Sequence, residues 1–269
     1  MTLESSLEFL GGKMEYSGEL SRIQQSLANC ADQLGRRAAV LGELRPRKGE
    51  RILDLGCGGG FYVKDIAATV GIDGQVTGID ISEDQIAAAS QRCKGMGNVL
   101  FETGDGFALP YNAASFDAVL SVQVCEYLQS ADGALREVFR VLKPGGRFVN
   151  VSTNWSQIYW TGEGAKLGGP IMTAWTGHAA HPNLASSLRS WLNGCRFSNV
   201  KQVPLPMLNI SYDEDRFGFW LAKLVAIYVE GHGIQESETK KWLDELRVLD
   251  EANVYFFGNF SVVTIASKK

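Results

Sequence analysis

The sequence predicts a doubly wound α/β fold, in which helices cover both faces of a mostly parallel sheet. Between residues 51 and 152, short β-rich runs alternate with helical stretches, the rhythm of a parallel sheet with crossover helices. Apolar residues in the helical stretches recur three or four positions apart, as in helices that pack on a sheet. The first β-rich run also leads directly into glycines, at the edge where open α/β sheets bind ligands.

The individual elements follow from local sequence. The four residues from Ser82 to Gln85 predict a capping box at the start of a helix, and the Lys-Pro-Gly-Gly run at 143–146 predicts a turn. The expected strands are 51–55, 75–80, 99–102, 116–121 and 146–152, and the expected helices between them are 62–70, 83–94 and 131–142.

Outside this region the regular alternation of β-rich and helical segments stops, which predicts helical lid insertions in the α/β core. Residues 153–182 are rich in Trp, Gly and Tyr and have neither helical nor strand periodicity, whereas 212–229 and 235–249 have the pattern of amphipathic helices. The expected organisation is an N-terminal helical lid at 1–48, the core at 49–153, a lid at 154–182, core again at 183–206, a second lid at 207–252 and final strand residues at 253–269.

Composition excludes several classes of protein. A formal net charge of −4 is unsuited to binding a phosphate backbone, so nucleic acid is not an expected partner. The five cysteines are scattered without a CxxC pair, so neither a metal site nor a disulfide framework is expected. The longest apolar run, 217–229, contains Lys223 and is too short to span a bilayer. With no signal-like N-terminus, these features predict a cytoplasmic protein with no membrane partner.

The glycine run carries the strongest functional signal. Asp54 is the next-to-last residue of the expected strand 51–55, and the pattern D-x-G-x-G-x-G continues from it through Gly56, Gly58 and Gly60. The dinucleotide pattern G-x-G-x-x-G would require glycine at position 61, which is Phe61. Binding of a nucleotide-like cofactor is therefore expected, although a tight turn without a ligand and an NAD-linked oxidoreductase remain alternatives.

Further motifs follow in order along the chain. Asp80 ends the second expected strand, Gly104-Asp105-Gly106 follows the third, and the segments 115–119 and 142–146 complete the series. With these motifs the chain resembles the class I S-adenosylmethionine-dependent methyltransferases, particularly the ubiquinone and menaquinone biosynthesis group. The resemblance is strong over residues 51–152. It implies a seven-stranded, Rossmann-like methyltransferase fold and S-adenosyl-L-methionine as the cofactor.

The resemblance also implies roles for individual residues. Asp80 would hold the ribose hydroxyls and Asp105 the adenine amino group, while Arg36 or Arg37 would pair with the methionine carboxylate. The alternatives are a helix-cap or surface acid for Asp80, an Asx turn for Asp105 and a solvated pair for the arginines. The full set expected at the cofactor is Tyr16, Arg36, Asp54, Gly56, Cys57, Gly58, Asp80, Ile81, Gln85, Gly104, Asp105, Gly106, Ser121, Gln123 and Tyr127.

The sequence offers three candidate catalytic residues. Many relatives have histidine near Tyr127, but this stretch offers Glu126, which is a candidate base or a structural acid. His178 and His181 lie in the first lid and are candidate bases, with surface positions or a metal pair as alternatives. The aromatic residues expected at the substrate are Trp155, Trp160, Trp175 and Tyr212, although each of them could simply pack the lid.

Together these features predict an enzyme that transfers a methyl group to an O, N or C atom of a small aromatic or apolar metabolite by in-line displacement. A monomer or homodimer with a small-molecule acceptor is expected. One rival is a noncatalytic S-adenosylmethionine-binding partner subunit. Another is an enzyme for arsenite or a similar thiophilic acceptor, which is disfavoured because no cysteine lies in the first lid.

Overall fold

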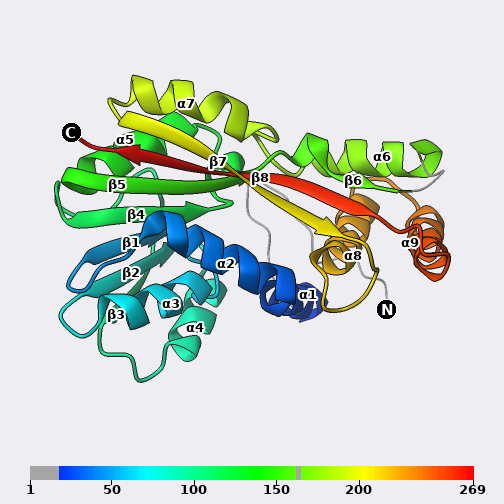
Figure 1. The fold of residues 1–269 in the computed structure, drawn as a ribbon, viewed down its shortest axis with the longest axis horizontal. Coiled ribbons are helices and arrows are strands. Elements are labelled where there is room, and N and C mark those ends of the chain that lie inside the picture. The colour runs from blue at the N-terminus through cyan, green and yellow to red at the C-terminus, as the bar shows by residue number, and fades with distance from the viewer. Residues whose placement is uncertain (1–17, 162–164) are drawn as a thin grey trace. The chain divides into compact units, whose positions relative to one another are not determined.

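The computed structural model describes residues 18–161 and 165–269 (Figure 1). The chain divides into two compact units, and several elements continue from one into the other. The larger unit comprises Arg37–Ser152, Leu184–Pro204 and Val262–Lys269; the smaller comprises Thr153–Asn183, Leu205–Ser261 and the N-terminal part up to Arg36.

The larger unit is built on a mostly parallel sheet. Five parallel strands lie in the order β3-β2-β1-β4-β5, followed by β8, with which β7 also pairs. The strand order reverses between β1 and β4, which creates the crevice at the carboxyl ends where open α/β sheets bind ligands. The strands are β1 (Arg51–Leu55), β2 (Gln75–Asp80), β3 (Val99–Thr103), β4 (Phe116–Val122), β5 (Leu142–Thr153), β7 (Ser198–Asn209) and β8 (Phe257–Ser267).

Helices cover both faces of this sheet, as Figure 1 shows, so the predicted doubly wound α/β fold is confirmed. On one face, Leu53, Val119 and Phe148 of the strands pack with Leu135 and Leu188 of the helices in one fully buried apolar cluster. The helices of the larger unit are α3 (Phe61–Val70), α4 (Glu83–Arg92), α5 (Ala131–Val141) and α7 (Leu184–Gly194).

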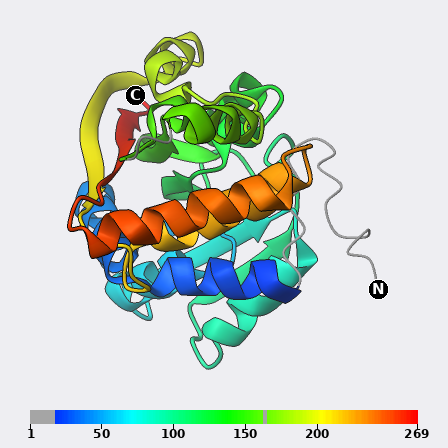
Figure 2. The ribbon, with the colours of Figure 1, turned by 90° about the vertical axis from the view of Figure 1, so that its right-hand side faces the viewer.

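The smaller unit is mainly helical. It holds α1 (Gly18–Asn29), the first residues of α2 (Ala31–Leu44), η2 (Trp155–Gln157), α6 (Ala165–Thr176), α8 (Phe217–Glu230) and α9 (Glu236–Glu251). Helix α8 packs against α1, α6 and α9. Figure 2 shows this unit with α9 toward the viewer. A further two-residue strand, β6 (Tyr159–Trp160), runs antiparallel to the start of β8. No helix within the described ranges has the length and apolar character that crossing a membrane requires.

Several predicted elements need correction. Ser82 does cap α4, because its hydroxyl accepts from the Gln85 amide at 3.4 Å. The reciprocal half of the predicted capping box is absent, since the Ser82 amide donates to Asp80 Oδ1 at 3.0 Å. Helix α6 lies in the region predicted to lack a regular period, where Pro170 and neighbouring glycines obscure the helical pattern. Helix α8 begins at Phe217 rather than at 212.

Candidate active site

The glycine bend after β1 is shaped by three residues with positive φ, at 69° for Gly56, 48° for Gly58 and 76° for Gly60. A Cβ on Gly56 would lie 2.2 Å from Val124 Cγ2, so this position tolerates no side chain. A Cβ on Gly58 would meet nothing closer than 3.6 Å, so the bend is open at its middle. Backbone can therefore approach a ligand there without obstruction.

Asp80 at the end of β2 is bonded to this bend. Its Oδ2 accepts from the Gly58 amide at 2.9 Å, and its Oδ1 accepts from the Ser82 amide at 3.0 Å. An ionised carboxylate offers about four acceptor positions. Asp80 thus retains acceptor capacity after organising the loop.

Asp54 lies on β1 beneath the bend and is only 2% exposed. Its Oδ2 has no hydrogen-bond partner among the described residues. Burial raises the pKa of Asp54 to about 7, and the nearby charge of Asp80 adds to the rise. A buried carboxyl in this condition is stabilised in its ionised form by any cation that reaches it.

The loop after β3 completes a row of acids at adjacent strand ends. Gly104 packs so closely on Ile79 that a Cβ would lie 2.7 Å from its Cδ1, which holds the loop against β2. Asp105 is exposed, and its Oδ1 accepts from the Phe107 amide at 3.0 Å. The Asx turn considered from the sequence therefore exists, and it leaves the second carboxylate oxygen of Asp105 for other use. Ile81 is 50% exposed and provides apolar surface just after β2.

The structure places four of the expected residues at the end of β4. Ser121 is buried with its hydroxyl 3.7 Å from Cys125 Sγ, and Gln123 has a positive φ of 54°. Glu126 and Tyr127 follow in a short 3₁₀ helix, η1 (Cys125–Tyr127), where Glu126 is fully buried.

Sequence reasoning missed two polar residues on the neighbouring strand β5. Asn150 pairs in register with Ser121, and both Asn150 and Ser152 are fully buried. Neither the Asn150 amide atoms nor the Ser152 hydroxyl has a hydrogen-bond partner within residues 18–161 and 165–269. One feature of the sequence could have indicated these two residues: Asn150 and Ser152 alternate with valines in an otherwise apolar strand.

In the smaller unit, three expected residues form one aromatic cluster. The His178 ring stacks on Trp175 at 3.8 Å between centroids and meets Trp155 edge-on at 4.7 Å. His178 Nδ1 donates to the Trp175 carbonyl, which leaves Nε2 as the acceptor nitrogen. Burial lowers the pKa of His178 to about 4, so the ring is neutral at physiological pH.

The other expected substrate residues lie elsewhere in that unit. Trp160 packs on Trp242 and Phe257, and Tyr212 packs on Phe219 and Tyr255. The aromatic residues thus form more than one cluster. His181 is half-buried, and Tyr16 lies outside the described residues.

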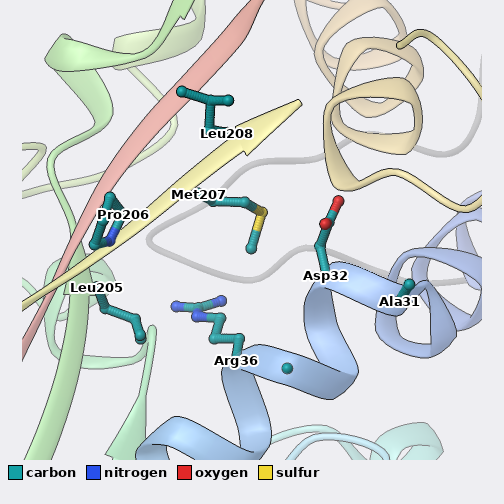
Figure 3. A pocket seen from close by; sticks show the side chains of 8 residues that line it. Ala31, Asp32, Arg36, Leu205, Pro206, Met207 and Leu208 are labelled. Atoms are coloured by element: carbon teal, nitrogen blue, oxygen red, sulfur yellow. The ribbon is translucent and has the colours of Figure 1, made fainter. Parts of the chain in front are cut away.

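The two candidate cations on α2 differ in their surroundings. Arg37 pairs with Asp65 at 3.5 Å and lies over the Phe61 ring at 5.2 Å. Arg36 is 6% exposed and lines a cavity of about 400 Å³ in the smaller unit (Figure 3). The residues around this cavity are Ala31, Asp32, Gly35, Arg36, Leu205, Pro206, Met207 and Leu208.

Comparison with known proteins agrees with this architecture. The profile of a family described as "Methyltransferase domain" matches residues 46–189. The chain belongs to the methyltransferase domain family. The predicted resemblance to class I methyltransferases of the menaquinone group is thereby confirmed.

Two curated relatives illustrate the match. The O-methyltransferase cnsE of Penicillium expansum is 38% identical over 154 residues, which cover 55% of this chain and 54% of that protein. The demethylmenaquinone methyltransferase of Lactococcus lactis is 38% identical over 120 residues, which cover 44% of this chain and 48% of that protein. The chain therefore spans about half the length of these relatives.

Among solved structures, Haemonchus contortus phosphoethanolamine N-methyltransferase 2 in complex with S-adenosyl-L-methionine has a TM-score of 0.63. It is 17% identical, and the match covers 95% of this chain and 58% of that one. At this identity the likeness establishes the fold alone.

Proposed function

We propose that this protein is an S-adenosylmethionine-dependent methyltransferase that methylates an O, N or C atom of a small aromatic or apolar metabolite. Membership of the methyltransferase domain family supports the reaction class. The bound S-adenosyl-L-methionine named for the Haemonchus contortus enzyme supports the choice of cofactor.

The proposal rests on one observation, the buried carboxyl of Asp54, whose Oδ2 has no hydrogen-bond partner among the described residues. S-adenosylmethionine bears a sulfonium and an ammonium, and both are cations. A buried carboxyl with an unpaired oxygen, next to an open glycine bend, fits such a ligand. Leaving a buried polar group without a partner costs about 1–3 kcal/mol, and a bound cation would offset that cost. The residues present therefore fit the cofactor.

Other residues complete the proposed cofactor site. The acceptor positions left on Asp80 suit the two ribose hydroxyls, and those on Asp105 suit the adenine amino group. The open backbone at Gly58 admits the methionine portion. We keep the further expected residues in their proposed roles: Tyr16, Arg36, Gly56, Cys57, Ile81, Gln85, Gly104, Gly106, Ser121, Gln123 and Tyr127.

The bound cofactor supplies an electrophilic methyl carbon on a sulfonium. The task of the chain is then to align an acceptor with that carbon and to exclude water. Glu126 is buried directly after β4 and is our first candidate for removing an acceptor proton. His178 offers a neutral Nε2 for the same purpose, and His181 is the third candidate.

We further propose that the predicted lid segments, 1–48, 154–182 and 207–252, enclose the acceptor above the core segments 49–153, 183–206 and 253–269. Trp155, Trp160, Trp175 and Tyr212 would supply aromatic surface for a flat or apolar acceptor. A thiophilic acceptor fits less well, because all five cysteines are buried and burial raises the pKa of Cys125 to about 12.

Calorimetry with the Asp80→Ala variant tests the cofactor site. We expect its affinity for S-adenosylmethionine to fall at least 100-fold, because the variant loses both the ribose partner and the bond that holds Gly58. Asp73→Ala, at an exposed acid in the turn before β2, is the matched control. Unchanged affinity in Asp80→Ala would show that the site is wrongly assigned, and tight binding of NAD instead would favour an oxidoreductase.

Methyl transfer itself is tested with a labelled donor and extracts of small metabolites. A labelled small product supports the enzyme. Donor binding without any transfer would favour a noncatalytic partner subunit instead.

A further inference from the structure

Helix α4 is joined to the glycine bend at two places. At its amino end, Asp80 accepts from the Gly58 amide in the bend and from the amide of Ser82, the residue that caps the helix. Toward its carboxyl end the helix meets the bend again, through Ala89 and Arg92. All of these residues belong to the larger unit, and Figure 1 shows α3, which follows the bend, beside α4.

The second contact begins with close packing of backbone on helix. A Cβ on Gly60 would lie 2.8 Å from the Cβ of Ala89 and 3.0 Å from its Cα, and Ala89 is fully buried. The bend therefore rests directly on α4 at this point. A side chain one helical turn further along α4 can then reach the carbonyls of the bend.

Arg92 is that side chain, and it contacts two parts of the bend region. Its Nε donates to the Gly59 carbonyl at 2.6 Å, which is a charge-assisted hydrogen bond. Its guanidinium carbon lies 3.5 Å from the centroid of the Phe61 ring, close enough for a cation–π interaction. One side chain thus links Gly59 in the bend to Phe61 at the start of α3.

Phe61 occupies the position at which the dinucleotide pattern requires its third glycine. That glycine serves close packing of the helix on the strand. Here a ring takes its place and provides the surface over which Arg92 lies. The guanidinium of Arg37, which pairs with Asp65 at 3.5 Å, lies 5.2 Å from the same ring.

We infer that Arg92 is a positioning residue for the cofactor, because it holds the glycine bend in the shape that is open at Gly58. Its partner Gly59 is the direct neighbour of Gly58, where the methionine portion is proposed to enter. A bend released at Gly59 would adopt other shapes as well, and the apparent affinity falls with the fraction of molecules in the competent shape. The inference rests on the proposed function and deepens it.

Two substitutions of similar length separate the charged donor from the packing of the side chain. Arg92→Met loses the donor, whereas Arg92→Lys keeps a cation for Gly59 and Phe61. By calorimetry, Arg92→Met should bind S-adenosylmethionine about tenfold more weakly than the parent, or about 1.4 kcal/mol, roughly the worth of one such hydrogen bond. Arg92→Lys should stay within about threefold of the parent. Arg189→Met removes an exposed arginine from α7 and controls for net charge.

Amide hydrogen exchange in the full chain tests the same role without a ligand. The Gly60 amide donates to the Cys57 carbonyl at 3.0 Å within the bend, and the Gly104 amide donates to the Asp80 carbonyl at 2.9 Å in the neighbouring loop. Arg92→Met should exchange about tenfold faster at Gly60 and at the parent rate at Gly104, because only the bend is released. Arg92→Lys should restore slow exchange at Gly60.

Thermal denaturation of both variants should stay close to that of the parent, since Arg92 is only half-buried. Parent-like exchange at Gly60 and parent-like affinity in Arg92→Met would overturn the inference. Equal losses in the Met and Lys variants would also overturn it, because the charged donor would then have no part. If the parent itself failed to bind S-adenosylmethionine, the proposed function would fail, while exchange at Gly60 would still decide whether Arg92 holds the bend.

Discussion

At the amino ends of the strands in the larger unit, polar groups are bonded to the chain itself. Arg147 donates to Glu50 and to the carbonyls of Leu44 and Arg45. Asp117 accepts from Lys143 at 2.7 Å and from the Arg51 amide at 2.8 Å. Burial opposes ionisation of Asp117, but these bonds outweigh it and lower the pKa of the carboxyl.

At the carboxyl ends of the same sheet the polar groups are more deeply buried, and fewer of them are bonded to the chain. Asp54, Asn150 and Ser152 have polar atoms without a hydrogen-bond partner in the described part of the chain. The pKa of Asp54 is raised rather than lowered, by burial and by Asp80. The difference indicates that polar groups at the amino ends stabilise the fold, whereas those at the carboxyl ends are left without partners, as we expect of the cofactor site that we propose there.

The largest expected effect comes from breaking the amino-end network. Arg147→Met should lower the free energy of unfolding by about 3 kcal/mol, because it removes the ion-pair partner of Glu50 and the donor to two carbonyls. Chemical denaturation measures this effect. Affinity for S-adenosylmethionine should remain within twofold of the parent at a temperature where the variant is folded, and a large loss of affinity would contradict the separation of the two ends.

The next comparison uses two asparagines. Asn98 donates to the carbonyls of Ala67 and Gly71 at 2.8 and 2.9 Å, so Asn98→Leu should cost about 2 kcal/mol of unfolding free energy. Asn150 has no such bonds, so Asn150→Leu should be neutral or stabilising by up to about 1 kcal/mol, since it removes an unsatisfied buried amide. Denaturation of both variants side by side tests the opposite signs, and equal destabilisation would refute the contrast.

The smallest expected effect is a pH dependence. Because Asp54 has a pKa of about 7 and a cationic ligand favours its ionised form, affinity for S-adenosylmethionine should fall by up to about tenfold per pH unit below pH 7. Calorimetry between pH 5 and 8 measures this slope. Asp54→Asn should bind more weakly with a flatter profile, and a parent profile as flat as that of the variant would remove Asp54 from the site.

The same carboxyl should affect stability in a defined direction. Its native pKa is raised above the ordinary 3.8, so the native state holds the proton more tightly than the unfolded chain does. The resulting contribution to stability is fully present below about pH 4 and is lost as pH rises through about 7. Comparison of parent and Asp54→Asn unfolding over this range isolates it.

Much of the fold could be predicted, because the decisive signals are local. Strands β1 and β2 begin and end at the predicted residues, since each is a short apolar run bounded by turn residues. Asp54 and Asp80 lie at the ends of such strands, and Asp105 comes two residues after β3, so sequence alone was enough to select these three acids as candidates.

The parts of the fold and of the candidate site that were not predicted depend on contacts between residues far apart in the chain, which cannot be seen in the sequence. Asn150 and Ser152 are notable only because nothing in the described ranges satisfies them, which requires coordinates to recognise. The cavity beside Arg36 joins α2 to β7, segments about 170 residues apart in the chain. Helix α6 was missed because Pro170 interrupts the pattern that would have indicated it.

The paired bonds of Asp80 have one more consequence. Its carboxylate connects the Gly58 amide in the glycine bend to the Ser82 amide that precedes α4, so one side chain couples two segments far apart in sequence. Whatever occupies the remaining lone pairs of Asp80 changes the electron density available to both amides. The proton chemical shifts and exchange rates of the two amides should then change together. The amides of Gly58 and Ser82 would therefore report, by NMR, whether a ligand is bound at the Asp80 carboxylate.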